Sequence, residues 1–324
     1  MGTTEIQGGG LAAPILVTGA TGIVGANLVH RLVADGFRPH LSVRAGSSRT
    51  RLQEVADAVI FESCDLADRE QVAALVQRVC PATVFHLAST FFNPPTLAAE
   101  THFQVNLLGS LYLFEALREL PEVRVVFTGT AMSYDSGAML REDAPLHPGS
   151  MIGCSKAATS LLAQACARLY GLQVVELRLF TPFGPWERPK RLIPHVILSA
   201  LSGQDVRIGD GRQQRDYTYM DDIVAALLLA VTRPVAAGAV YNICSGTPCR
   251  IVDVVEQILS LMGNPVAVQV GTFPPRADEI WEISGDNTLA ATELGWRPAV
   301  SFQEGLQRTI AWFQHNQALA LKLS

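Results

Sequence analysis

The sequence lacks several features that mark whole classes of protein. No apolar run approaches the roughly 18 residues needed to cross a membrane, so we expect no membrane partner. The 25 basic side chains are outnumbered by 30 acidic ones, and a net charge of −5 argues against nucleic acid as a partner. The six cysteines form no CxxC pair, and the chain starts without a secretory pattern. We therefore expect reduced cysteines and a cytoplasmic location.

What is present is an ordinary globular composition, with 48% hydrophobic and 17% charged residues over 324 positions. From residue 14 onward, short β-branched runs alternate with segments of helical period, as in βαβ units. The chain therefore predicts a doubly wound parallel α/β sheet of the Rossmann type, with strands near 15–18, 41–43, 58–61, 83–87, 123–127 and 174–177.

The rhythm of the sequence changes after about residue 180. Four prolines crowd positions 182–194, and the elements that follow are short and mixed. We expect a loose tail at residues 1–13, a dinucleotide-binding domain at 14–180 and a smaller α/β substrate domain at 181–324. Some segments of the second domain are expected to return to the first sheet.

A three-glycine loop directly follows the first expected strand and opens the first expected helix. Glycine at such places lets the backbone turn sharply and approach a pyrophosphate, whose charge the helix N-terminus attracts. A tight turn alone is the simpler alternative, but the strand before and the helix after favour a dinucleotide site. The candidate cofactor residues in this loop are Gly19, Thr21, Gly22, Ile23, Val24 and Gly25.

The segment after the second expected strand contains no carboxylate. NAD-binding folds usually offer one there to the ribose 2′-hydroxyl. This chain instead offers Arg44, with Ser47, Ser48 or Arg49 nearby, and a guanidinium binds phosphate oxygens well. The cofactor prediction is therefore NAD(P) with a preference for NADP, against the alternative that these are solvated loop residues.

Five motifs follow one another along the chain: TGATGIVG at 18–25, CDL at 64–66, HLA at 86–88, Asn106 with Gly109, and RDYTYMDD at 215–222. Together they resemble the motifs of the extended short-chain dehydrogenases/reductases, and the resemblance extends over residues 14–316. Within that family, the chain is most similar to the NAD-dependent epimerase/dehydratase group, which acts on nucleotide sugars. The resemblance implies that Asp65, Leu66, Leu87 and Ala88 contact the cofactor.

In that family a Ser/Thr, a Tyr and a Lys carry the chemistry, because hydride transfer at a carbinol carbon requires proton transfer at its oxygen. Lys156 and Thr130 match the Lys and the Ser/Thr, and the resemblance implies that Lys156 also holds the nicotinamide ribose. Ile152 stands where the Tyr is expected, and its side chain can neither donate nor accept a proton. Three interpretations follow: another group supplies the proton, the chain is an inactive variant, or it binds cofactor without turnover.

Four other side chains are candidates for the missing proton carrier or for the pocket wall. Tyr134 has suitable chemistry and is a catalytic candidate, although the family usually has a packing Tyr there. Cys154 lies near a helix start, where a thiol can acidify, but a neighbour of the helix cap is the simpler role. His86 at a strand end is more often structural, and Ser133 is expected to line the substrate pocket.

The resemblance also implies a substrate site for a nucleotide-diphosphate sugar linked to UDP or dTDP. The family's diphosphate-binding Asn is replaced by Thr181, while Arg215 and Arg276 retain the two cations. Phe91, in the loop after the fourth strand, is expected to face the hexose. Each arginine has a simpler role as the partner of a neighbouring acid.

The implied activity is hydride transfer at sugar C4, as a 4-ketoreductase or an epimerase. The 4,6-dehydratase members carry an Asp-Glu pair where this chain has Ala131 and Met132, which disfavours ordinary dehydration. A silent cofactor-binding variant and a dehydratase or lyase with a different acid remain the alternatives. The resemblance further implies a homodimer formed by the helices near 100–118 and 155–170.

Overall fold

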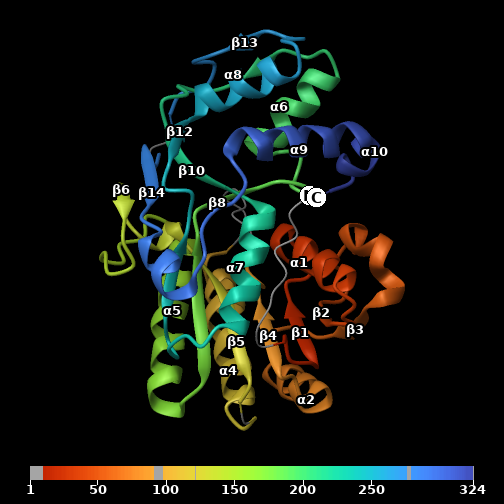
Figure 1. The fold of residues 1–324 in the computed structure, drawn as a ribbon, viewed down its shortest axis with the longest axis vertical. Coiled ribbons are helices and arrows are strands. Elements are labelled where there is room, and N and C mark those ends of the chain that lie inside the picture. The colour runs from red at the N-terminus through yellow and green to blue at the C-terminus, as the bar shows by residue number, and fades with distance from the viewer. Residues whose placement is uncertain (1–9, 91–97, 121, 276–278, 324) are drawn as a thin grey trace.

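A seven-stranded parallel sheet forms the centre of the fold. The computed structural model describes residues 10–90, 98–120, 122–275 and 279–323 (Figure 1). The strand order is β11-β7-β5-β4-β1-β2-β3. Their bounds are β1 Ile15–Thr18, β2 His40–Val43, β3 Ile60–Ser63, β4 Thr83–His86, β5 Arg124–Thr130, β7 Gln173–Leu179 and β11 Val240–Ile243. The predicted fold class and the six predicted strands are confirmed, and β11 is the seventh.

Two layers of helices cover this sheet. Because both of its faces are buried, its strands are continuous apolar runs in the sequence. Val17 in β1 lies opposite Leu41 and Phe85 in the neighbouring strands, and all three side chains are buried. One face packs on α1 (Ile23–Ala34) and α7 (Met220–Thr232). The other face packs on α2 (Arg69–Val79), α4 (Gly109–Leu117) and α5 (Met151–Tyr170).

A smaller region lies beyond one end of the sheet, at the top of Figure 1. Its helices are α6 (Leu192–Leu201), α8 (Ile251–Leu261), α9 (Phe302–His315) and the short α10 (Gln317–Ala320), and they share a core of their own. Its five-stranded sheet contains β6 (Gly137–Leu140), β8 (Thr181–Phe183), β10 (Gln214–Tyr219), β12 (Pro248–Arg250) and β14 (Glu282–Gly285), and a separate pair is formed by β9 (Val206–Arg207) and β13 (Val268–Gln269).

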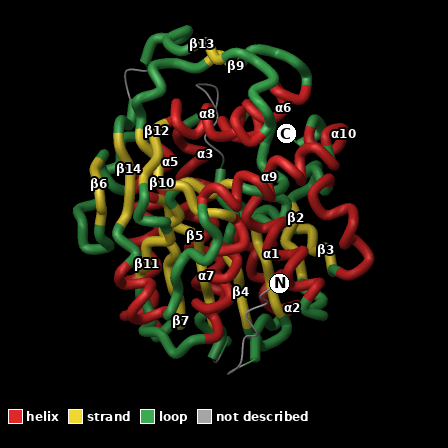
Figure 2. The backbone as a smooth tube through the Cα atoms, turned by 45° about the horizontal axis from the view of Figure 1, so that its top comes forward, coloured by secondary structure: helices red, strands yellow, loops and turns green. Residues whose placement is uncertain are grey.

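The chain crosses between the two regions more than once. The strand β6 comes from before residue 180 yet pairs with β14, whereas β11 and α7 come from after residue 180 and join the first sheet. The backbone tube in Figure 2 shows α7 beside the large sheet and α6 and α8 above it. Division of the chain at residue 180 stays a prediction.

Part of the expected N-terminal tail is held by the fold. Residues 1–9 lie outside the described residues. Leu11 packs on the core, and the carbonyl oxygen of Ala12 accepts a hydrogen bond of 2.7 Å from the Thr83 hydroxyl. The segment just before β1 is therefore not loose.

The helix expected near 100–118 is interrupted. It consists of α3 (Ala99–His102), a π-helical turn over Phe103–Leu108, and α4. Asn106 lies within the π-helical turn, and such turns are frequent at functional sites. In the described part of the chain, no helix is both long and apolar enough to cross a membrane, and no cluster of His, Cys, Asp or Glu there is arranged to hold a metal ion.

Candidate active site

The three-glycine loop forms a bend whose geometry leaves no room for larger residues. Gly19 has a φ of +69°, and a Cβ there would lie 2.5 Å from the backbone nitrogen of Ala88. A Cβ on Gly25 would overlap the carbonyl oxygen of Gly19. Gly22 caps α1 without any side-chain hydrogen bond, so the start of the helix carries no competing carboxylate or hydroxyl. These residues fit the pyrophosphate of a dinucleotide.

The strand ends beside this bend are joined by a buried histidine. His86 Nδ1 lies 2.7 Å from Thr18 Oγ1, and its Nε2 lies 2.8 Å from Ser110 Oγ. Burial, together with the positive charge of Lys156, lowers the pKa of His86 to about 3. The imidazole is therefore neutral, and its two hydrogen bonds favour the structural role for His86 over that of a proton carrier. Leu87 and Ala88 continue from it past Gly19, beside the glycine bend.

Two further predicted cofactor residues lie at the end of β3. Asp65 accepts a hydrogen bond of 3.0 Å from the backbone nitrogen of Ala67, and its own backbone nitrogen donates to Gln71. Leu66 is buried against Gly109, where a Cβ would lie 3.0 Å from the Leu66 carbonyl oxygen. The Asp65–Leu66 turn is thus fixed at the edge of the cofactor region by α2 and α4.

The arginines after β2 differ in their surroundings. Arg44 is exposed, and its guanidinium has no hydrogen bond or ion pair with any described residue. Arg49 instead stacks over the Phe61 ring at 4.2 Å, and Ser48 pairs with Thr50. Arg44 is therefore the guanidinium in this segment that is free to bind an incoming anion.

The start of α5 lies against the turn that follows β5. Ser150 caps α5 by accepting a hydrogen bond from the Gly153 nitrogen at 3.2 Å. Gly153 allows this close approach, because a Cβ there would overlap the carbonyl oxygen of Met132. Ile152 is half-buried in this first turn, and Cys154 is exposed. A role for Cys154 as a proton carrier is not supported, because its side chain points to solvent.

Lys156 is buried one helical turn after Ile152. Its Nζ donates a hydrogen bond of 2.8 Å to the carbonyl oxygen of Thr128 at the end of β5. Burial lowers the pKa of Lys156 from 10.5 to about 8, while the carboxylate of Glu176 opposes this shift. The ammonium donates one of its three hydrogens to Thr128, so it retains two for a ligand.

Thr130 ends β5 on the same side of the site. Its Oγ1 accepts a hydrogen bond of 3.2 Å from the Met132 nitrogen. The hydroxyl proton of Thr130 has no acceptor among the described residues, which leaves it available to a substrate oxygen. Ser133, two positions after Ala131, is fully buried, and its hydroxyl also has no described partner.

Asn106 connects the π-helical turn to α5. Its Nδ2 donates to Ser155 Oγ at 2.9 Å and to Thr90 Oγ1 at 3.0 Å, and its Oδ1 accepts from the Thr90 nitrogen. His102 Nδ1 lies 2.6 Å from Thr90 Oγ1. Ser155 itself donates to the carbonyl oxygen of Ile152. The first turn of α5 is thus supported by a continuous hydrogen-bonded network.

Tyr134 belongs to a buried structural network. Its hydroxyl donates to Asn242 Oδ1 at 2.8 Å and accepts from Arg178 Nη1 at 2.7 Å. Arg178 also pairs with Glu176, and the Ser160 hydroxyl donates to the same carboxylate. Burial raises the pKa of Tyr134 to about 12. Both contacts and pKa favour the packing role over the catalytic one.

A cavity of about 590 Å³ lies between the large sheet and the smaller region. Its wall includes Ala131 and Met132, next to Thr130, and the predicted residues Thr181 and Arg215. Arg215 forms an ion pair with Glu279 at 3.4 Å rather than with Asp216, whose carboxylate instead accepts hydrogen bonds from residues 245, 246 and 285. Phe91 and Arg276 lie outside the described residues.

Sequence reasoning missed several side chains in this wall. They include Glu187, Arg191, Arg207, Gln213 and Phe273. The proline-rich stretch 182–194 was interpreted only as irregular chain, yet it supplies the first two of them. The combination of prolines with charged residues in this stretch could have indicated a binding site, because a solvated loop does not need so rigid a backbone.

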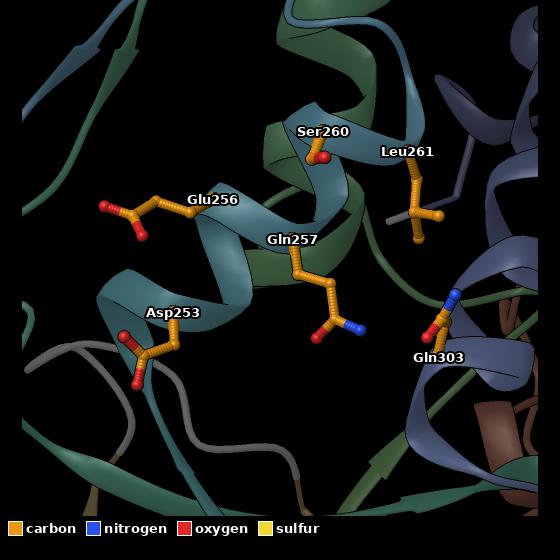
Figure 3. A pocket seen from close by; sticks show the side chains of 6 residues that line it. All are labelled: Asp253, Glu256, Gln257, Ser260, Leu261 and Gln303. Carbon is orange, nitrogen blue, oxygen red and sulfur yellow. The ribbon is translucent and has the colours of Figure 1, made fainter.

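A second hollow, of about 440 Å³, lies between α8 and α9. Figure 3 shows Gln257, Leu261 and Gln303 facing the space between these helices, whereas Glu256 points away from it. No cation of the described chain lines this hollow, and it lies far along the smaller region from the glycine bend. We therefore place the candidate site at the larger cavity.

Comparison with known proteins gives consistent matches. A model of the "NAD dependent epimerase/dehydratase family" matches residues 15–244. The chain is 30% identical to a dTDP-glucose 4,6-dehydratase of Xanthomonas campestris over 93% of each chain. It is similar to the structure of UDP-glucose 4-epimerase from Thermotoga maritima with UDP-glucose, with 26% identity, a TM-score of 0.83 and coverage of 94% and 99%. It is also similar to the Thermus thermophilus UDP-glucose 4-epimerase complex with NAD, with 29% identity, a TM-score of 0.80 and coverage of 93% and 98%.

The role of Tyr134 can be tested with Tyr134→Phe. We expect the free energy of unfolding to fall by about 1–3 kcal/mol, because Asn242 and Arg178 each lose a buried partner. Cofactor affinity should not change. Urea unfolding and a cofactor titration measure the two effects, and Tyr170→Phe at an exposed ring is the matched control. Full stability together with lost turnover would show that Tyr134 acts in catalysis.

Proposed function

The chain belongs to the NAD dependent epimerase/dehydratase family, and from that premise we propose that it modifies a nucleotide-diphosphate sugar by NAD(P)-dependent hydride transfer at C4. The reaction is that of a 4-ketoreductase or an epimerase. Two of the similar solved structures are UDP-glucose 4-epimerases, one with NAD and one with UDP-glucose.

One observation carries this proposal: the wall of the cavity of about 590 Å³ contains both the turn that follows β5 and a group of arginines. Met132 marks the end beside Thr130, and Arg191 and Arg215 lie in the wall elsewhere. A diphosphate needs fixed cations, and a sugar attached to it then extends toward the reacting residues. The glycine bend and the buried Lys156 supply the adjoining cofactor region.

The residues around the reacting carbon have separable tasks. The bound nicotinamide supplies or accepts the hydride. Thr130 orients the sugar oxygen with its unpartnered hydroxyl proton, and Lys156 holds ribose hydroxyls with its two remaining ammonium hydrogens. The nearby ammonium also lowers the pKa of any acid in contact with it, which assists proton transfer at that oxygen.

The turn after β5 argues against ordinary 4,6-dehydration. That reaction needs one group to protonate the leaving hydroxyl and another to remove the C5 proton. Ala131 is buried and apolar, and Met132 lines the cavity with a thioether. Neither side chain transfers a proton at neutral pH. A reductase or an epimerase needs no such pair.

The position of Ile152 gives the decisive test. In Ile152→Tyr, a phenol stands one helical turn before the Lys156 ammonium. We expect wild-type protein, incubated with UDP- or dTDP-sugars and NAD(P), to convert the sugar slowly. The variant should change this rate by tenfold or more, because a positioned acid or base typically contributes roughly 10²–10⁴ to a rate. Ile152→Phe adds the same ring without the hydroxyl and is the matched control. Cofactor absorbance and product chromatography measure the change.

The outcomes separate the alternatives for Ile152. Activity that rises in Ile152→Tyr and not in Ile152→Phe means that the natural site uses a weaker proton source. Activity that falls in both means that the isoleucine belongs to an unusual mechanism. Tight binding of the sugar nucleotide with no turnover in wild type, even over long incubation, would contradict the proposed reaction and favour a silent binding protein.

The preference for NADP is a second part of the proposal. Arg44 supports it, because it is exposed and has no partner among the residues that the structure describes, and charge-assisted bonds to a 2′-phosphate are worth about 1.5–3 kcal/mol. We expect Arg44→Gln to weaken NADP binding by about tenfold or more and to leave NAD binding unchanged. Fluorescence titration measures both, with Arg49→Gln as the control because Arg49 stacks on Phe61. Equal affinity of the wild type for both cofactors would contradict this part.

We also propose a homodimer formed through α4 and α5. Leu161 and Leu169, eight residues apart on α5, are 61% and 69% exposed and share one helix face. We expect Leu161→Asp to dissociate the dimer in sedimentation analysis, because a charge on this face opposes its burial. Leu321→Asp, at a similarly exposed site beyond α10, is the control. A wild-type monomer would contradict the assembly.

A further inference from the structure

Glu187 is a buried carboxyl in the wall of the cavity. It follows Trp186, whose backbone has a φ of +66°, in the loop that leads to α6. The Glu187 side chain is 7% exposed, and its Oε1 accepts a hydrogen bond of 3.3 Å from Arg191 Nε. Its Oε2 is enclosed and has no hydrogen-bonding partner among the described residues. A nearly buried carboxyl with one unpartnered oxygen thus stands in the cavity wall.

The charged groups near Glu187 come from several elements. Arg191 lies directly before α6, and Arg51 lies in the 3-10 helix Thr50–Ala58, with its own Nη2 buried and unpartnered in the described chain. Other groups that face the same region are Arg188, Lys190, His195, Arg207, Asp210, Arg215, Tyr217 and Glu279. Arg215 pairs with Glu279, and Asp210 pairs with Arg212. Cations therefore outnumber acids in the surroundings of Glu187.

Glu187 belongs to the ligand-holding part of the site rather than to the reacting centre. The charges that act on it are those of Arg191 and Arg51, whereas Lys156 acts on His86 and interacts with Glu176. Its neighbours are thus the cations that suit a diphosphate. A carboxylate there opposes an incoming dianion, and a neutral carboxylic acid does not.

Resting on the proposed function, we propose that Glu187 takes up a proton when a nucleotide-diphosphate sugar occupies the cavity. The neutral acid removes the repulsion between this wall and the diphosphate. The protonation of Glu187 thereby makes the affinity of the site for its ligand depend on pH.

The protonation state of the free site supports this inference. Burial raises the pKa of Glu187 to about 7, although Arg191 and Arg51 oppose the shift. An added negative charge favours the protonated form and raises this pKa further. Near neutral pH the free carboxyl is partly ionised, so ligand binding draws a proton from solution. Affinity then falls as pH rises through the pKa of the free site.

Calorimetry tests this linkage directly. UDP-glucose and dTDP-glucose are titrated into the wild-type protein in buffers of different ionisation enthalpy, and the slope gives the protons taken up. Sugar nucleotides suit the experiment because their doubly esterified diphosphate does not titrate near neutral pH. If binding raises the pKa by one unit, we expect uptake of about half a proton at pH 7.5 and an affinity loss of about threefold from pH 7 to 8.

Two variants identify the group that takes up the proton. Glu187→Gln keeps the shape and the bond to Arg191 but cannot titrate, so uptake should vanish. At pH 8 this variant should bind the ligand about threefold or more tightly than wild type, because the repulsive charge is gone. A merely structural glutamate would give the opposite change. His195→Gln, which changes a different side chain of the same cavity wall, should retain the uptake.

The results distinguish this inference from the proposed function. Binding of either ligand without proton uptake, or uptake that disappears in His195→Gln and persists in Glu187→Gln, overturns the role of Glu187 and leaves the proposed function intact. Failure of both ligands to bind the wild type at any pH overturns the proposed function and this inference with it. Thermal unfolding of Glu187→Gln verifies that the variant is folded in the comparison.

Discussion

The hydrogen bond between Lys156 Nζ and the Thr128 carbonyl oxygen is the interaction on which the site depends. It joins the first turns of α5 to the end of β5, at a distance of 2.8 Å inside the protein. Burial of this ammonium is costly: a pKa of about 8 in place of 10.5 corresponds to roughly 3 kcal/mol at neutral pH. Because the folded pKa is the lower one, this cost shrinks as pH rises from about 8. Because burial of Lys156 destabilises the fold in this way, we expect this residue to act on a ligand.

Two Arg–Glu pairs in this chain, one buried on both sides and one with an exposed arginine, show how similar chemistry serves different ends. Arg178 and Glu176 are satisfied by each other, by Ser160, by Tyr134 and by the Glu142 carbonyl oxygen, so the first network is closed and ties β7 to its surroundings. The Arg191–Glu187 pair keeps an unused carboxyl oxygen and lines a cavity. Complete hydrogen bonding favours rigidity, whereas an incomplete network leaves capacity for a ligand.

The sequence predicted those parts of the molecule that short-range patterns determine. Strand runs such as 15–18 and the helix over 69–79 follow from periodicity and caps, and the glycine bend follows from its place between a strand and a helix. The π-helical turn at Asn106 was not predictable, because it depends on Thr90 and on Ser155, which is 49 residues away. The smaller sheet was not predictable for the same reason, because its strands have three to six residues and pair across long separations in the sequence.

Arg51 shows most clearly what the sequence alone could not predict. It also links the glycine bend to the loop that bears Glu187. Its Nε donates to the carbonyl oxygen of Trp186, 135 residues away, at 2.9 Å, and its Nη1 donates to the carbonyl oxygen of Thr21 at 3.2 Å. Trp186 in turn stacks on His30 of α1 and lies against Trp312 of α9. One guanidinium therefore holds the glycine bend and the loop bearing Glu187 in a fixed relation. Since both anion-binding regions share this support, Arg51 ties the position of one backbone to that of the other, together with the Asn27 amide, which donates to the Pro185 carbonyl oxygen at 3.2 Å.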